Sequence, residues 1–238
     1  SNIMRIYSGS AWENVAVSTT GFATLAGVET LTNKTLTSPK INEDVAVTST
    51  ATELNLLDGA TVVLPGKIEG TNFTNSLIVG HTTTGTLNNA QKNTAVGLNS
   101  MTKLTSGDQN TVLGAFAGQQ LTTGVNNLFV GAVAGQNGTT HNSNTYVGTN
   151  AGTNATGSSG VALGYAALIN STGSKNIAIG QSAGDNITSG AGNVIIGTTI
   201  DAPSATADRQ LVIAGYDGST TTTWISGDSN GQVKLVSG

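Results

Sequence analysis

The side chains that could carry chemistry are few and scattered along this chain of 238 residues. Its two histidines are His81 and His141, and neither has neighbouring carboxylates that would complete a catalytic triad or a metal cluster. His141 lies in the phrase GTTHNSN, where we expect an exposed loop residue. The alternative is that each histidine meets its own copies around a threefold axis and binds an ion there.

The acidic residues lead to a similar expectation. Asp217 (in YDGS) and Asp228 (in GDSNG) place oxygen atoms near glycines, but a calcium loop needs further carboxylates at fixed spacing, so both phrases predict hairpin turns. Glycan cleavage needs a pair of acids about 5 to 10 Å apart. Asp108 and Asp185 are too far apart along the chain to pair in a simple stack, and residues 109–174 contain no charged side chain. We therefore expect no enzyme.

Composition excludes several other classes of protein. The chain has no Cys, 32 Gly and 9% charged residues, against about 25% charge in ordinary soluble domains. The net charge of −4 argues against nucleic-acid binding. No run of about 18 apolar residues predicts a membrane span, and no phosphate-loop or dinucleotide motif predicts a cofactor. The start, SNIMRIYSG, resembles neither a signal peptide nor a usual initiator sequence, as expected of a fragment, a processed product or a tagged chain.

A glycine that recurs at a nearly constant interval dominates the middle of the chain. Each one closes a short apolar phrase such as NTAVG or NIAIG. The repeat glycines are Gly80, Gly97, Gly114, Gly131, Gly148, Gly164, Gly180 and Gly197. A repeat this short is one coil of a stacked structure, in which the glycine allows a sharp corner or a close backbone approach.

Two further positions recur with the glycine. An asparagine that can bond local backbone and tolerate a turn usually stands four residues before it: Asn93, Asn110, Asn127, Asn144, Asn176 and Asn193. An apolar residue always stands immediately before it, and we expect these residues to be core: Val96, Leu113, Val130, Val147, Leu163, Ile179 and Ile196. The pattern predicts parallel strands stacked about 4.8 Å apart.

The apolar phrases also bear on assembly. Side chains alternate between the two faces of a strand, and both the last and the middle residue of each phrase are apolar. Two buried faces are therefore indicated, of which only one can line the coil interior. The other needs a second surface, and we expect self-association as a homotrimer to supply it.

Four regions separate by pattern. Residues 1–30 indicate two short strands around a Ser8-Gly9-Ser10 turn. Residues 31–75 form a Thr-rich connector with a short helix expected near 51–57, where Thr50 and Glu53 have capping-box spacing. The β-roll array occupies residues 76–200. Residues 201–238 break the period and indicate a small β-meander of three strands.

Aromatic residues could recognise sugars, but packing is the simpler interpretation. Phe116, Phe129, Tyr146 and Tyr165 all lie in or beside the strand phrases, where we expect them inside a coil or between subunits. Trp224 is expected to plug the end of the terminal meander. The alternative for Trp224 is contact with a receptor at the end of a fibre.

The repeats resemble the head domains of trimeric autotransporter adhesins, most clearly in NIAIGQSAG at 176–184 and VALGYAAL at 161–168. The resemblance covers roughly residues 76–200 and implies a left-handed parallel β-roll packed as a trimer. The period of 16 or 17 and the frequent NT start of the strands depart from that family's phrase. Hexapeptide acyltransferases, which need an apolar residue at every sixth position, match less well.

The flanking phrases resemble tail-fibre and other appendage proteins of bacteriophages, in GSAWENVAV at 9–17, LTNKTLTSPKI at 31–41 and TATELNLLDGAT at 50–61. This resemblance implies a structural, host-facing segment of a virion. Its expected partners are other virion proteins and a host-surface glycan or protein. A bacterial surface adhesin head is the alternative, and a glycan-degrading tailspike is a minor one.

Overall fold

The computed structural model describes residues 5–14, 66–70, 72–80 and 84–236. The chain divides into two units, residues 1–61 and 62–238, which are described separately. In the first unit, β1 (Arg5–Tyr7) and β2 (Trp12–Asn14) form an antiparallel pair around the predicted turn. The helix expected near 51–57 lies outside the described residues, and the described residues contain only strands and loops.

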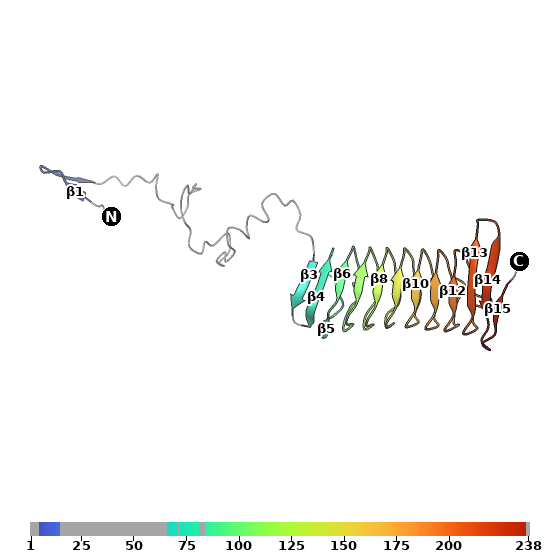
Figure 1. The fold of residues 1–238 in the computed structure, drawn as a ribbon. Coiled ribbons are helices and arrows are strands. Elements are labelled where there is room, and N and C mark those ends of the chain that lie inside the picture. Colours follow the sequence, from blue (N-terminus) through green and yellow to red (C-terminus); the bar gives the residue numbers. More distant parts are fainter. Residues whose placement is uncertain (1–4, 15–65, 71, 81–83, 237–238) are drawn as a thin grey trace. The chain divides into compact units, whose positions relative to one another are not determined.

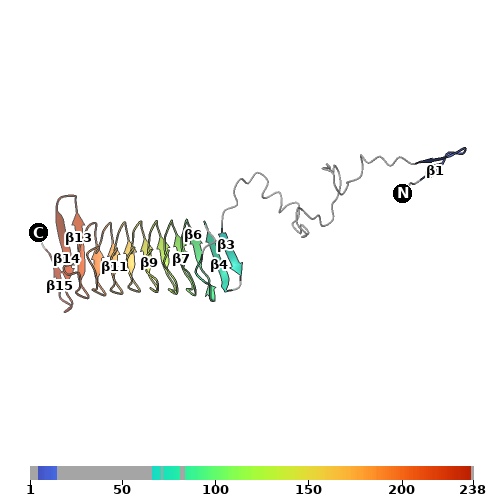
Figure 2. The ribbon, with the colours of Figure 1, turned by 180° about the vertical axis from the view of Figure 1, so that it is seen from behind.

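The second unit is built on one sheet whose strands follow one another in chain order, apart from the short β5, which pairs only with β4 (Figures 1 and 2). Its central strands are short and parallel, with one strand in each coil. The strands are β3 (Gly66–Gly70), β4 (Phe73–Val79), β5 (Ala90–Gln91), β6 (Thr94–Val96), β7 (Thr111–Leu113), β8 (Leu128–Val130), β9 (Thr145–Val147), β10 (Val161–Leu163), β11 (Ile177–Ile179), β12 (Val194–Ile196), β13 (Leu211–Tyr216), β14 (Thr221–Gly227) and β15 (Val233–Leu235). The expected all-β parallel solenoid is confirmed.

The register of the sheet reproduces the period of the sequence. Val96 of β6 pairs with Leu113 of β7, which pairs with Val130 of β8, so each strand is displaced from the last by one full repeat. Between β9 and β10, Val147 pairs with Leu163, so the register follows the repeat there even though that repeat is shorter. Equivalent residues therefore form columns that run along the sheet, and each coil repeats the environment of the one before it.

The repeat glycine serves both of the purposes expected of it. Gly131 has a φ of +130°, which side-chain-bearing residues rarely adopt. A Cβ at this position would lie 2.5 Å from the carbonyl oxygen of Gly148 in the next coil. The chain thus turns out of the strand at this residue, and the backbones of adjacent coils meet there too closely for any side chain.

The interior of the coils is filled by matching large residues with small ones. The middle residue of each strand points inward, and it is Ala95 in β6 but Phe129 in β8. In the coil of β6, where the inward residue is the small Ala95, the segment after the strand supplies the large side chain of Met101, which is fully buried. Beside Phe129 it supplies Gly135, where a Cβ would come within 2.8 Å of the ring. The coils keep a constant cross-section in this way although their side chains differ in volume.

The sheet extends beyond the array boundaries expected from the sequence. At one end β3 pairs antiparallel with β4. At the other, Ile213 of β13 pairs with Ile196 of β12, so the regular displacement continues past the expected boundary. Ala214 stands where a repeat glycine would follow Gly197, and the strand continues to Tyr216 in place of turning. The three strands expected in the terminal meander are present as β13, β14 and β15.

Candidate functional site

The two faces of the sheet differ sharply in exposure. In β7, Val112 is buried inside the coil, whereas its neighbours Thr111 and Leu113 point outward and are exposed. Among the residues expected to be core, Val96 is 38% exposed, Leu113 50% and Ile179 38%. These residues lie outside the interior of the single chain, and the middle residue of each strand forms the core in their place.

We call the outward side of strands β4 to β13 the outer face. Its two columns, which run from Leu77 and Val79 to Leu211 and Ile213, are apolar or Thr at every position, with no charged side chain. The apolar members are Leu77, Val79, Val96, Leu113, Leu128, Val130, Val147, Val161, Leu163, Ile177, Ile179, Val194, Ile196, Leu211 and Ile213. Single exposed leucines are common on protein surfaces. A continuous surface of aliphatic side chains is instead typical of an interface between protein chains.

The recurring asparagines lie inside the coils and connect each coil to the next. The Asn110 backbone N–H donates to Asn93 Oδ1 at 3.1 Å, and Asn110 Nδ2 donates to the Gly124 carbonyl at 2.9 Å. Asn127 makes the equivalent bonds to Asn110 and to the His141 carbonyl. The expectation that these residues bond local backbone holds for Asn176, whose Nδ2 donates to the Gly173 carbonyl at 3.1 Å, whereas Asn110 and Asn127 bond partners in adjacent coils.

The asparagine column is interrupted once. Gly160 occupies the position between Asn144 and Asn176, and its backbone N–H still donates to Asn144 Oδ1 at 2.7 Å. At the far end Gln210 takes the same position and bonds Asn193 Oδ1 through both its backbone N–H and its side chain. Each buried hydrogen bond contributes about 1 kcal/mol, so the column adds stability that is spread evenly along the array.

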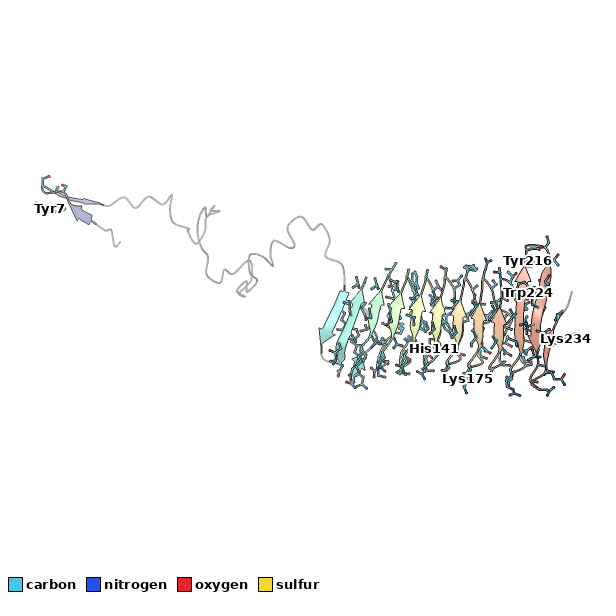
Figure 3. All side chains as sticks on the ribbon, in the orientation of Figure 1. Tyr7, His141, Lys175, Tyr216, Trp224 and Lys234 are labelled. Carbon is cyan, nitrogen blue, oxygen red and sulfur yellow. The ribbon has the colours of Figure 1, made fainter. Side chains whose placement is uncertain are left out.

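His141 is buried, and the expectation of an exposed loop residue is wrong. It occupies the position of Gly124 in the preceding coil, while Gly138 stands where that coil has Leu121. Because Gly138 leaves the space empty, the imidazole fills it and packs edge-on against Phe129, with ring centres 5.2 Å apart. Phe129 stacks in turn on Tyr146 at 5.3 Å. Figure 3 shows His141 in the middle of the array.

The protonation of His141 follows from its contacts. Its Nδ1 lies 3.2 Å from the Ala155 carbonyl oxygen, which can only accept, so Nδ1 carries the proton. Nε2 is buried without a hydrogen-bond partner. Desolvation by burial lowers the pKa of His141 to about 4, and burial raises the pKa of Tyr146. A buried neutral imidazole with no neighbouring nucleophile is a packing residue. His81 lies outside the described residues.

Asp185 and Asp201 form a pair of carboxylates that the sequence analysis missed. They lie 16 residues apart in successive coils, close to the length of one repeat, and that spacing was the available signal. Burial, followed by hydrogen bonding and charge repulsion from Asp201, raises the pKa of Asp185. Two carboxylates that lie close together repel each other, which favours the protonated form of Asp185.

The remaining predicted residues fall at the ends of strands or near the surface. Asp217 Oδ1 accepts from the backbone N–H groups of Ser219 and Thr220, and Asp228 caps the β14–β15 turn in the same manner, as expected of hairpins. Asp108 Oδ1 accepts from the Gln91 backbone N–H of the neighbouring coil.

The aromatic residues divide into two groups. Phe129 and Tyr146 are buried as expected, whereas Tyr165 is 52% exposed. Trp224 is 53% exposed and does not plug the end of the sheet. Two hollows of about 540 and 400 Å³ lie there, which share Pro203 and Ser226 in their walls.

Comparisons of this chain with protein families, with characterised proteins and with solved structures gave no match. Within the described ranges there is also no helix long and apolar enough to cross a membrane, and no three His, Asp or Glu side chains are gathered in a way that would hold a metal ion. Among the described coils, the outer face is the surface on which aliphatic side chains gather in continuous columns.

Proposed function

We propose that this chain is a non-enzymatic structural segment of a bacteriophage fibre or appendage, and that three copies assemble through their outer faces. The observation that carries the proposal is the outer face from β4 to β13, where one column is apolar at every position and the other is apolar or Thr, on a coil whose interior is already filled. An aliphatic side chain removed completely from water contributes about 1.5 to 3 kcal/mol, so partial burial of many of them would hold chains together.

A mechanical role agrees with the construction of the coils. Each coil bonds its neighbours through the strand, the asparagine column and the returning segment, which gives a rod about 40 Å long at about 4.8 Å per coil. Placement in a virion rests on the resemblance of the flanking phrases to phage appendage proteins, and the choice of three copies rests on the resemblance of the repeats to trimeric adhesin heads. A surface adhesin head shares the second resemblance and lacks the first.

Light scattering on the purified chain tests the assembly. The expected mass is three times that of one chain, and Leu113→Lys is expected to reduce it to a single chain because the new charge would be buried in the interface. Thr123→Lys is the matched control, since Thr123 is exposed in the loop between β7 and β8 and should leave the mass unchanged. A wild-type monomer or dimer would contradict the proposal.

The location and the absence of catalysis need separate experiments. Labelled antibody against this chain is expected to decorate an appendage of intact particles, and decoration confined to a bacterial surface would favour the adhesin. Incubation with capsular polysaccharide is expected to release no oligosaccharides, and their release would establish an enzyme.

A further inference from the structure

The β13–β14 hairpin carries two exposed aromatic side chains at its outer end. Tyr216 is 41% exposed and Trp224 is 53% exposed. The hairpin extends past the corners at which the other coils turn; Tyr216 lies on the extending part, and Trp224 lies lower on β14, beside the corner position of Ala214 (Figures 1 and 3). Its length follows from the replacement of the repeat glycine by Ala214, after which the strand continues. The break in the repeat thus produces a projecting element.

The local backbone holds Trp224 in place. The pairing of β13 with β14 shifts register between Ile213 and Ala214, which leaves Trp224 as the extra residue of a β-bulge. The indole lies against Gly215, where an added Cβ would come within 2.7 Å of Cη2 and 2.8 Å of Cζ2. The ring is therefore supported on one side by backbone while half of its surface remains open to solvent.

A groove of about 310 Å³ adjoins this ring. It is lined by Gly215, Tyr216, Asp217, Thr220, Thr222 and Trp224. Backbone N–H groups of Thr220 and Ser219 that bond to Asp217 lower the pKa of its carboxyl, so it is ionised at neutral pH. The groove thus combines an apolar ring face with a hydroxyl-bearing rim and a carboxylate, which are the few convergent polar groups typical of small-ligand sites.

We propose that this groove binds one sugar unit of a neutral polysaccharide. A pyranose presents C–H groups on one face and hydroxyls around its edge, which match the indole of Trp224 and the polar groups of Thr222 and Asp217. The inference rests on the proposed function, in which the hairpin is exposed on an appendage. Three copies in one assembly would convert weak single-site binding into firm attachment through avidity.

A quaternary ammonium group is the competing ligand, because aromatic faces and a carboxylate also attract cations. Such ligands are enclosed by several aromatic faces. Here the Tyr216 hydroxyl donates to the Gly218 carbonyl at 2.8 Å, which ties Tyr216 to the turn and leaves the indole as the freely presented ring. The rim threonines both donate and accept, which suits hydroxyls better than a cation that makes no hydrogen bonds.

Fluorescence titration of the full chain tests the proposal. Trp12→Phe removes the other tryptophan, so that emission reports on Trp224 alone. The probes are maltohexaose, cellohexaose and mannohexaose, with tetramethylammonium as the competing ligand. At least one sugar is expected to change the emission saturably, with a dissociation constant on the order of 1 mM. No response to all three sugars, or a response to tetramethylammonium alone, would overturn the proposal.

Matched variants locate the site by calorimetry with the sugar that binds. Trp224→Ala is expected to weaken binding at least about tenfold and Thr222→Val by a smaller factor. Tyr165→Ala removes an equally exposed aromatic ring from the array and should leave the affinity unchanged. Undiminished binding by Trp224→Ala would reject the site. Light scattering on the same samples separates the two proposals, since a trimer that binds no sugar rejects only this one.

Discussion

The interior of the coils and the outer face of the same sheet are built from similar aliphatic residues, yet only the interior is complete within one chain. Inside, the large ring of Phe129 is matched by Gly135, and the small Ala95 by Met101. Outside, Leu113 is half exposed beside other aliphatic side chains. The interior is thus complete within a single chain, whereas the aliphatic residues of the outer face stay partly exposed, and the proposed assembly would cover them.

The largest loss of stability is expected from a substitution at a corner between adjacent coils. Gly131→Ala places a Cβ against the Gly148 carbonyl and also forces a φ of +130° on alanine. We expect a loss of more than about 3 kcal/mol in the free energy of unfolding, measured by urea denaturation. Gly218→Ala is the control, because its φ is also positive, at +100°, but no atom lies within 4 Å of the added Cβ. A similar loss in both variants would show that close packing of the corners is unimportant.

Truncation of one inward side chain and one outward side chain to alanine compares how much each face of the sheet contributes to stability. Phe129→Ala should cost about 3 to 5 kcal/mol at every protein concentration, because the ring lies inside one chain. Leu113→Ala should cost less than about 1 kcal/mol in the dissociated chain and more as assembly proceeds. Thermal unfolding over a range of protein concentrations measures both. A Leu113→Ala cost that does not depend on concentration would remove the distinction between the faces.

His141 makes the interior sensitive to acid. Its pKa is lowered from 6.5 to about 4 in the folded chain, so the unfolded chain binds the proton first as the pH falls. The stability attached to the neutral imidazole is therefore complete above pH 6.5 and is lost between there and pH 4. The loss should approach about 3 kcal/mol. His141→Phe keeps a ring in the space, and the difference between the two stability profiles isolates this residue; parallel profiles would contradict the assignment.

The smallest expected effect concerns Asp185 near the surface. Its raised pKa means that the folded chain favours the protonated carboxyl, so this contribution is present at low pH and is lost as the pH rises. Asp185→Asn should therefore raise the melting temperature slightly at pH 7 and less at pH 4. A decrease at pH 7 would show that favourable contacts of the Asp185 carboxylate, such as the hydrogen bond with Ser182, outweigh the repulsion from Asp201.

The sequence predicted the parts of the structure that follow from its period. The spacing of the repeat glycines established the stacked parallel strands, and Gly131 turns a corner as expected. The prediction failed where the position of a side chain depends on the space that another residue leaves. His141 is buried because Gly138 leaves room for its ring. Asp185 and Asp201 escaped notice for a related reason, since they are 16 residues apart and only the stacking of successive coils brings them close.

The break at Ala214 shows the limit of reading a repeat from its glycines. The missing glycine indicated that the array had ended, but β13 pairs with β12 at the same displacement and continues the sheet. The apolar residues from Leu211 to Ile213 stand one repeat after β12, and they were the available mark of this continuation. The orientation of Trp224 was hidden, because it depends on a shift in register.

Thiol accessibility tests the central claim most directly, since the chain contains no cysteine. Leu113→Cys and Thr123→Cys each introduce a single thiol, one on the outer face and one in an exposed loop. In the native assembly, the Leu113→Cys chain is predicted to react with a maleimide at least about tenfold more slowly than the Thr123→Cys chain, and the two should react alike in denaturant. Equal rates in the native protein would show that the outer face is open to solvent and would contradict assembly through it.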